Sequence, residues 1–278
     1  MKIAIIGSGA MGSLYGGILA EEGHEVYFID VFEEHIKQVN EKGLCIVEKG
    51  KERYIKNIKA TTDAKEVGEV DLAIVFVKST VTDIAVEQNK AVIGKDTIVL
   101  TLQNGIGNIE KISKYVDKSQ IIAGTSANGA SMLEPGKIKH AGNGGTVIGE
   151  IDGQVTNRIK KLKEILDVEK LGPCEVSDNV MGLIWDKLLV NVGINALTAV
   201  TGLKNGQLLE YKETEEILEK LVNEGIQVAK ALGIKLKYTT PEHCKNVCKA
   251  TAENTSSMLA DVLNKRRTEI MNINGAIV

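Results

Sequence analysis

The sequence lacks three features that would each place it in a broad class of proteins. It has four cysteines but no Cys-x-x-Cys pair: Cys45, Cys174, Cys244 and Cys248. We therefore expect neither a disulfide framework nor a metal site, and we expect reduced thiols, as in the cytoplasm. No apolar run looks long enough to span a bilayer. The formal net charge of −3 argues against a basic surface for nucleic acid or an anionic membrane.

The length of the chain, 278 residues, is that of about two ordinary domains. Hydrophobic residues make up 43% and charged residues 26% of it, as in soluble globular proteins with a sizeable core. The N-terminal segment MKIAIIGSGAMG begins like a signal peptide, but glycines follow its short apolar run. We therefore expect no secretion signal and a cytoplasmic location.

Residues 1–177 alternate short apolar runs with amphipathic stretches. KIAIIG, EVYFID, DLAIVFVK, TIVLTLQN and QIIAGTS resemble strands, and MGSLYGGILAEEG resembles a helix. Continuous hydrophobicity is typical of strands that are covered on both faces. Strand, helix and strand in succession predict right-handed crossovers and a doubly wound, parallel, Rossmann-type sheet. Residues 136–150, GKIKHAGNGGTVIGE, are predicted to form a hairpin that closes this domain.

Residues 178–278 are predicted to form an all-α domain. A long apolar helix is expected around WDKLLVNVGINALTAV, and ETEEILEKLVNEGIQVAKALG has apolar residues at helical spacing. The segment that starts at Pro241 is expected to be helical with a break. The predicted fold is thus an α/β Rossmann-type doubly wound sheet domain, residues 1–177, followed by an all-α C-terminal domain, residues 178–278.

A glycine-rich loop follows the first predicted strand in G-x-G-x-x-G spacing. Alone the pattern is weak, but here it joins a strand to a helix, as a dinucleotide site requires. The first glycine permits the turn, the second admits the pyrophosphate, and the third lets the helix pack on the strand. Free N–H groups at the helix start then hold the anion. The predicted cofactor loop is Gly7, Ser8, Gly9, Ala10, Met11 and Gly12; the alternative is a turn without a ligand.

Asp30 ends the second predicted strand. A carboxylate there can accept hydrogen bonds from the adenosine ribose hydroxyls and would repel a 2′-phosphate. No basic residue lies beside it before Lys37, and Glu33 and Glu34 add negative charge. Asp30 therefore favours NADH over NADPH, unless it serves as a helix cap.

Three polar residues interrupt the long apolar segment at intervals of four: Lys187, Asn191 and Asn195. This spacing places them along one face of a helix. An unpaired buried amide costs about 1–3 kcal/mol, and an isolated buried ammonium costs more unless it loses its proton. The stripe either faces solvent or another element, or it lines a cleft that faces a nicotinamide. In the second case Lys187 could be a general acid and the amides could hold a polar substrate.

The histidines do not suggest a malate- or lactate-dehydrogenase type of mechanism. His24, His35, His140 and His243 have no evident aspartate partner. We expect His24 and His140 to be structural and His35 to lie on a surface helix. A lysine is therefore the better candidate for a proton donor.

The chain resembles the ketopantoate reductase (2-dehydropantoate 2-reductase) family over essentially its whole length. The resemblance is carried by IAIIGSGAMGSLYGG, FVKS, LQNGIGN, GKIKHAGNG, WDKLLVNVGINALTAVTGLKNG and ENTSSMLADVLNKRRTEIMNINGAI. The last two segments are specific, and the first is shared by many dehydrogenases. The resemblance implies an oxidoreductase that reduces 2-dehydropantoate to (R)-pantoate in pantothenate and coenzyme A biosynthesis. It also implies an active site in a cleft between the two domains.

The resemblance also implies roles for individual residues. Catalytic roles fall on Lys187 and Glu269; substrate-binding roles on Asn104, Asn191, Asn195, Asn205, Asn254 and Ser257; and cofactor-side roles on Lys78 and Asn104. As a hydrogen-bond acceptor, Glu269 could bind a substrate hydroxyl or orient Lys187. Five of them have a plain alternative: Asn205 in a turn, Asn254 and Ser257 on a helix surface, Glu269 paired with Arg266, and Lys78 as a strand cap.

Two features depart from the family pattern. Many relatives prefer NADPH and carry a basic residue where Asp30 stands, so the cofactor is NADPH or NADH. The chain also stops just after NGAI, where relatives usually continue with further helix. Two rival functions stay open: a related 2-keto acid reductase, and a dinucleotide-binding sensor without catalysis. The expected partner is a small keto acid, with no nucleic acid or membrane, and a homodimer is a further expectation.

Overall fold

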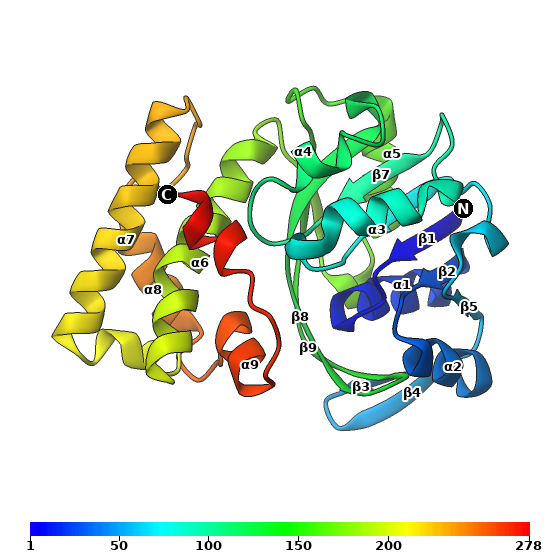
Figure 1. Ribbon diagram of the computed structural model, residues 1–278, viewed down its shortest axis with the longest axis horizontal. Coiled ribbons are helices and arrows are strands. Elements are labelled where there is room, and N and C mark those ends of the chain that lie inside the picture. The colour runs from blue at the N-terminus through cyan, green and yellow to red at the C-terminus, as the bar shows by residue number, and fades with distance from the viewer. The chain divides into compact units, whose positions relative to one another are not determined.

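The computed structural model describes residues 1–278 and divides into two compact units (Figure 1). Unit 1 comprises Met1–Gln103 and Asn108–Val180, and unit 2 comprises Asn104–Gly107 and Met181–Val278. The sequence predicted a boundary between two domains after residue 177. The division into compact units does not test whether those domains are independent, so this boundary stays a prediction.

Unit 1 is built on one ten-stranded sheet with the order β4-β3-β9-β8-β7-β6-β1-β2-β5, and β10 pairs with β9. The strands are β1 Lys2–Ile6, β2 Glu25–Ile29, β3 Leu44–Glu48, β4 Lys51–Ile55, β5 Ile58–Thr61, β6 Leu72–Val75, β7 Ile98–Thr101, β8 Ile121–Glu134, β9 Lys137–Glu150 and β10 Cys174–Val176. From β5 to β8 all neighbours are parallel. The pairs β8–β9 and β3–β4 are antiparallel. The expected parallel Rossmann core is present, but the whole sheet is mixed.

Both faces of this sheet are covered, which explains why its strands are continuously apolar. Successive residues of β1 point to opposite faces, and its Ile3 and Ile5 belong to one buried cluster while Ala4 and Ile6 belong to another. The helices of unit 1 are α1 Ala10–Glu21, α2 Glu33–Lys42, α3 Thr82–Gln88, α4 Asn108–Ile112 and α5 Asn157–Leu166. Helices α1, α2 and α5 contribute to the first cluster, and α3 and α4 to the second. The double winding predicted for this domain is confirmed.

The predicted hairpin at residues 136–150 is wrong in detail. These residues form a single strand, β9, which pairs with β8 in a long hairpin that turns at Pro135 and Gly136. Gly136 has φ +75°, a conformation that favours glycine. The prediction required a turn inside residues 136–150, whereas β9 runs without a turn from Lys137 to Glu150.

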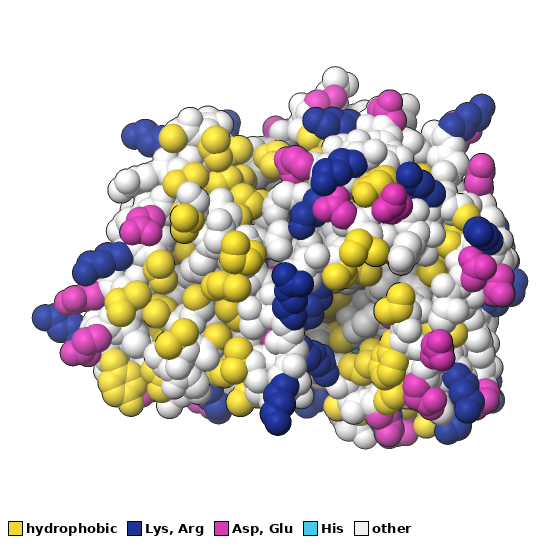
Figure 2. Space-filling view, in the orientation of Figure 1, with side chains coloured by type: hydrophobic (Ala, Val, Ile, Leu, Met, Phe, Trp, Pro, Cys, Tyr) yellow, Lys and Arg dark blue, Asp and Glu magenta, His cyan; other side chains and the backbone are white.

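Unit 2 is helical, as predicted. Its helices are α6 Val180–Thr201, α7 Lys212–Ala231, α8 Glu242–Ala250 and α9 Ser257–Leu263, with short 3-10 turns η6 Gly206–Leu209, η7 Ile270–Asn272 and η8 Asn274–Ala276. The expected break falls between α8 and α9. Figure 2 shows apolar side chains over much of the visible face of this unit. Exposed apolar residues of unit 2 include Val200, Ile217, Leu232, Leu263 and Met271.

Helix α6 corrects one expectation about membranes. With 22 residues and a mean hydropathy of 1.4 over its most apolar window, it is long and apolar enough to cross a bilayer. However, 56% of that window is buried within the protein, and the helix carries Asp186 and Lys187. These properties are those of a core helix.

Candidate functional site

The glycine loop of unit 1 has the geometry that an incoming phosphate needs. Gly7 has φ +92°, and a Cβ built on it would lie 2.6 Å from the backbone nitrogen of Val77. A Cβ on Gly12 would overlap the carbonyl oxygen of Gly7 and lie 2.9 Å from Ile5. Gly9 is exposed, and a Cβ there would have no neighbour within 4 Å. Two glycines therefore close the turn, and the third leaves its backbone open to a ligand.

Helix α1 begins directly after this loop. Gly9 is its N-cap and has no side chain to satisfy the free N–H groups, and the first turn carries no acidic residue. Ala10 and Met11 are half-buried in that turn, and Ser8 is fully buried. The unpaired N–H groups and the helix dipole together favour an anion at this end.

A cavity of about 400 Å³ lies beside the loop within unit 1. Ile6, Gly7 and Asp30 contribute to its wall. The rest is mostly small or apolar: Ile29, Val31, Thr62, Asp63, Ala64, Val77, Val81, Ile84, Ala85, Gln88 and Asn89. The volume and the mixed lining suit an aromatic ring with a polar sugar attached. The residues fit the adenosine end of a dinucleotide.

Asp30 is held at the edge of this cavity by two hydrogen bonds. Its carboxylate accepts one from the backbone N–H of Phe32, at 3.0 Å, and one from the hydroxyl of Ser8, at 3.3 Å. The first bond is a turn contact before α2 and not a helix cap, because Phe32 is the N-cap of α2 and no side chain caps that helix. The carboxylate lines the cavity, and the cofactor role of Asp30 stays a prediction.

Lys78 and Asn104 follow neighbouring strands but fall in different units. Lys78 lies in unit 1, shortly after the end of β6, and directly precedes the 3-10 turn η2 Ser79–Val81. Asn104 follows β7 and groups with unit 2. In its loop, Ile106 donates its backbone N–H to the carbonyl of Asn272, at 3.2 Å. The structure therefore places Asn104 in the unit that carries the other predicted substrate residues.

The polar stripe of α6 is partly buried. Asn195 is 4% exposed, whereas Lys187 and Asn191 are half-buried. Although some of the residue surface of Lys187 is exposed, its ammonium is enclosed by protein, and this burial lowers the pKa from 10.5 to about 8. The nearby Glu269 carboxylate acts in the opposite direction and raises the pKa of Lys187. A lysine with such a pKa can release its proton near neutral pH.

Three segments of unit 2 bring the remaining predicted residues together in pairs. Asn195 donates from its amide to the hydroxyl of Ser257 at the start of α9, at 3.3 Å. The backbone N–H of Asn205 donates to the carbonyl of Asn254, at 3.1 Å. Asn254 and Ser257 are exposed, so their polar groups are accessible.

Asn205 has a structural environment. It is 8% exposed, and its amide nitrogen donates to the hydroxyl of Thr251, at 2.9 Å. Its side-chain oxygen is buried and makes no hydrogen bond. These contacts tie the segment after α6 to the end of α8, as the turn alternative for Asn205 would require.

The sequence did not point to Asp186, which lies on α6, or to Asn274, which is hydrogen-bonded to α6. Asp186 is 6% exposed and accepts hydrogen bonds from the backbone N–H groups of Lys237 and Tyr238. Asn274 donates to the carbonyl of Val192, at 3.0 Å, while its side-chain oxygen is buried without a partner. Asp186 lies next to Lys187, so its polarity alone could have drawn attention; Asn274 had no such signal.

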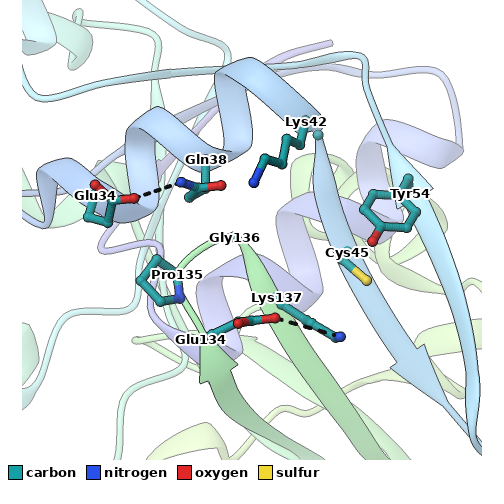
Figure 3. Close-up of a pocket in the computed structure, with 10 residues that line it drawn as sticks. Glu34, Gln38, Lys42, Cys45, Tyr54, Glu134, Pro135, Gly136 and Lys137 are labelled. Atoms are coloured by element: carbon teal, nitrogen blue, oxygen red, sulfur yellow. Dashed lines mark hydrogen bonds and ion pairs between the residues drawn. The ribbon is translucent and has the colours of Figure 1, made fainter.

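A second cavity in unit 1, of about 310 Å³, lies between α2, the β3–β4 hairpin and the β8–β9 turn (Figure 3). Lys137 in its wall contacts Glu134, also in the wall, at 3.6 Å, and Glu52, outside the wall, at 2.7 Å. Glu34 accepts a hydrogen bond from Gln38. None of the predicted site residues lines this cavity, so it is separate from the candidate dinucleotide site.

Comparison with known families gives a match over most of the chain. The family described as "Ketopantoate reductase PanE/ApbA" matches residues 3–153, and "Ketopantoate reductase PanE/ApbA C terminal" matches residues 179–278.

Curated relatives match over the full chain. A protein of Pyrococcus horikoshii named 2-dehydropantoate 2-reductase is 38% identical over 100% of this chain and 90% of its own length. One of Halobacterium salinarum with the same name is 35% identical over 100% of this chain and 91% of its own.

Two solved structures share the fold. A PanE/ApbA family ketopantoate reductase from Ralstonia eutropha has a TM-score of 0.91 and 32% identity. A ternary structure of D-mandelate dehydrogenase with NADH and anilino(oxo)acetate has a TM-score of 0.92 and 33% identity. Each covers 100% of this chain and 90% of the other.

Proposed function

We propose that this chain, which belongs to the ketopantoate reductase family, reduces 2-dehydropantoate to (R)-pantoate with a reduced nicotinamide dinucleotide. The observation that carries the proposal is Lys187, an enclosed lysine whose pKa is lowered to about 8, in a chain whose other unit has an open glycine loop. An enzyme needs such a proton donor, and a sensor that only binds a dinucleotide does not.

Unit 1 supports the cofactor part of this proposal. Gly9 leaves the pyrophosphate position open, and a side chain at Gly7 or Gly12 would collide with the backbone. The adjacent cavity has room for an adenosine. When bound, the cofactor supplies the hydride that reduces the 2-keto carbon.

Lys187 is proposed to be the general acid. Negative charge develops on the keto oxygen during reduction, and the ammonium stabilises this charge and donates its proton. Burial brings the pKa of Lys187 to about 8, so the protonated form is abundant at neutral pH and still transfers readily. Glu269 raises the pKa of Lys187 and so keeps the lysine charged.

The amides and hydroxyl near Lys187 are proposed to hold the substrate. Asn191 and Asn195 follow Lys187 along α6 at intervals of one turn, and Ser257 is hydrogen-bonded to Asn195. Amides and hydroxyls can donate to a carboxylate and to a hydroxyl of the keto acid, and a fixed pose raises the rate. Asn104 and Asn254 are assigned to the same task, Asn205 to the support of Asn254, and Lys78 to the cofactor.

NADH is proposed as the preferred cofactor. The Asp30 carboxylate lines the adenosine cavity and would repel the 2′-phosphate of NADPH. Its hydrogen bonds from Phe32 and Ser8 hold it there. The family resemblance implies a basic residue at this position in many relatives that prefer NADPH, so Asp30 would mark a departure within the family.

The test is the oxidation of reduced cofactor in the presence of 2-dehydropantoate, followed by absorbance at the nicotinamide band. NADH and NADPH are compared side by side at equal concentration. We expect turnover with 2-dehydropantoate and a higher kcat/KM with NADH. A protein that binds the cofactor but turns over no keto acid would contradict the enzymatic proposal.

A related 2-keto acid reductase is the second candidate. It is favoured by the similarity to D-mandelate dehydrogenase, whose structure holds NADH and the oxo acid analogue anilino(oxo)acetate. A panel of 2-keto acids with aliphatic and aromatic side chains separates the two candidates. Turnover of an aromatic keto acid, without turnover of 2-dehydropantoate, would replace the first proposal by the second.

We further propose that the protein acts in the cytoplasm and forms a homodimer. Its four cysteines are all free and buried, which suits a reducing compartment. Exposed apolar residues on unit 2, among them Leu232 and Leu263, would gain from burial against a second copy. Light scattering coupled to gel filtration would decide, since a monomer at micromolar concentration contradicts the dimer.

A further inference from the structure

His35 is not on the surface, contrary to the expectation from the sequence. It lies on α2 but is 1% exposed. Its ring is almost parallel to those of Phe28 and Phe32, with centroids 6.4 and 6.3 Å away. A buried polar ring of this kind needs hydrogen-bond partners, and those of His35 come from two distant parts of unit 1.

The two ring nitrogens of His35 have different partners. Nδ1 accepts a hydrogen bond from the backbone N–H of Gly136, at 2.9 Å. Nε2 lies 3.2 Å from the hydroxyl of Ser13 on α1. That hydroxyl donates its own hydrogen to the carbonyl of Ser8, at 2.7 Å, so it must accept from Nε2. The neutral ring with its hydrogen on Nε2 satisfies every contact, and burial lowers the pKa of His35 accordingly, although Asp30 acts against it.

These contacts end in the cofactor loop. The Ser8 carbonyl is one side of the peptide that joins Ser8 to Gly9, and in a trans peptide the carbonyl and the following N–H point in opposite directions. A carbonyl held toward Ser13 therefore directs the Gly9 N–H away from Ser13. Gly9 is the exposed glycine whose surroundings are open. The hydroxyl of Ser8 donates to Asp30, at 3.3 Å, so the same residue also connects to the ribose side of the cavity.

Gly136, at the other end of these hydrogen bonds, is itself held by two contacts. Gly136 receives a backbone hydrogen bond from Cys45, at 2.8 Å, and a Cβ on it would lie 2.7 Å from Gln38 of α2. Figure 3 shows Gly136 in the β8–β9 turn, beside the α2 residues Gln38 and Glu34. The β8–β9 turn therefore fixes the His35 ring through the hydrogen bond from Gly136 to Nδ1.

We propose that His35 is a positioning residue for the dinucleotide: through Ser13 it fixes the Ser8–Gly9 peptide so that the Gly9 N–H faces the pyrophosphate. The proposal rests on the dinucleotide role proposed above for the glycine loop. It assigns the affinity for the cofactor in part to a residue that does not itself touch it, and to a turn far away in sequence.

The test measures binding of NADH, or of NADPH if the wild type prefers it, by fluorescence titration without keto acid. His35→Leu removes both hydrogen bonds, and Ser13→Ala removes the link to Ser8 but keeps the packing of His35. Each variant should weaken binding about five- to tenfold, as expected for one lost hydrogen bond. His35→Gln keeps one acceptor and one donor and should recover at least half of the lost affinity on a logarithmic scale.

Steady-state rates add a second measurement. KM for the dinucleotide should rise with Kd, while kcat and KM for the keto acid stay within about twofold. The matched control is His24→Leu, because His24 belongs to the same unit but contacts the N-terminal ammonium, at 3.3 Å, and not the loop. This control should bind like the wild type.

Several outcomes would overturn the proposal. Wild-type affinity in Ser13→Ala, or His35→Gln as weak as His35→Leu, would show that packing and not the hydrogen bonds determines binding. If His35→Leu does not fold, Ser13→Ala and His35→Gln decide. Failure of the wild type to bind either dinucleotide would instead contradict the proposed function, so the two failures are distinguishable.

Discussion

The two units form their candidate sites from different parts of the chain. In unit 1 the candidate site is made of backbone: the space at Gly9 and the N–H groups at the start of α1 are proposed to hold an anion. In unit 2 the site is made of side chains, with a partly buried lysine and amides along α6. The candidate site of unit 1 depends on the absence of a side chain at Gly7, Gly9 and Gly12. The candidate site of unit 2 depends on the polar side chains that it carries.

This difference decides how each site responds to change. A backbone site tolerates no added atom where the chain approaches itself, and it loses binding when a side chain intrudes. A side-chain site keeps its shape when one polar group is removed but loses that group's chemistry. Substitutions in unit 1 should therefore affect cofactor affinity, and those in unit 2 should affect turnover.

The largest effect is expected for Lys187→Ala. Loss of the general acid should reduce kcat by about 10²–10⁴-fold, while Kd for the dinucleotide changes less than about twofold. Lys204→Ala is the matched control, because Lys204 lies in the same unit and pairs with the exposed Glu253, at 2.6 Å. If Lys187→Ala lost cofactor binding and turnover equally, this result would contradict the assignment of cofactor affinity to unit 1 and of turnover to unit 2.

Gly7→Ala should have the next largest effect and the opposite pattern. A Cβ at φ +92° and 2.6 Å from the nitrogen of Val77 must displace the loop. We expect dinucleotide affinity to fall by about tenfold or more, beyond a backbone strain of about 1–2 kcal/mol. Gly23 has φ +86° but no neighbour within 4 Å, so Gly23→Ala should share the strain and keep the affinity. Fluorescence titration and thermal unfolding separate the two.

Asp30→Arg tests how a side chain refines the backbone site. An arginine can bind the 2′-phosphate with charge-assisted hydrogen bonds worth about 1.5–3 kcal/mol, so the ratio of kcat/KM for NADPH to that for NADH should rise by about tenfold or more. The control is Glu33→Arg, an equal change of charge at an exposed position that does not line the cavity. A wild type that already strongly prefers NADPH would contradict the role given to Asp30.

The smallest effect concerns pH. A general acid must be protonated, so kcat for reduction should be constant below the Lys187 pKa of about 8 and fall as the pH rises above it. Glu269 raises the pKa of Lys187, so Glu269→Gln should move this alkaline limb to lower pH. An unchanged limb in Glu269→Gln, or one that persists in Lys187→Ala, would assign the titration to another group.

The sequence predicted the local parts of both sites well. The G-x-G-x-x-G spacing between a strand and a helix specifies a turn whose geometry depends on residues close in the chain, and the structure has that turn after β1. The interval of four likewise placed Lys187, Asn191 and Asn195 along α6. The roles of these residues stay predictions, because the spacing does not say what faces the stripe.

The errors arise where distant segments meet. His35 was expected on a surface helix, but the β8–β9 turn, 101 residues later in the chain, donates a hydrogen bond to its buried ring. The misplaced hairpin at residues 136–150 has a similar origin, since glycines inside a long strand resemble turn residues until their partner strand is known.

By itself the sequence determined which segments are strands and helices in the main, where the glycine turn lies, and which residues of α6 share a face, because each of these depends on neighbours within a few positions. The tertiary structure alone decided that Lys187 is enclosed and carries a lowered pKa, that Asn195 meets Ser257, and that His35 links the β8–β9 turn to the cofactor loop. Burial and hydrogen-bond partners are properties of the assembled surroundings, and no local pattern of residues contains them.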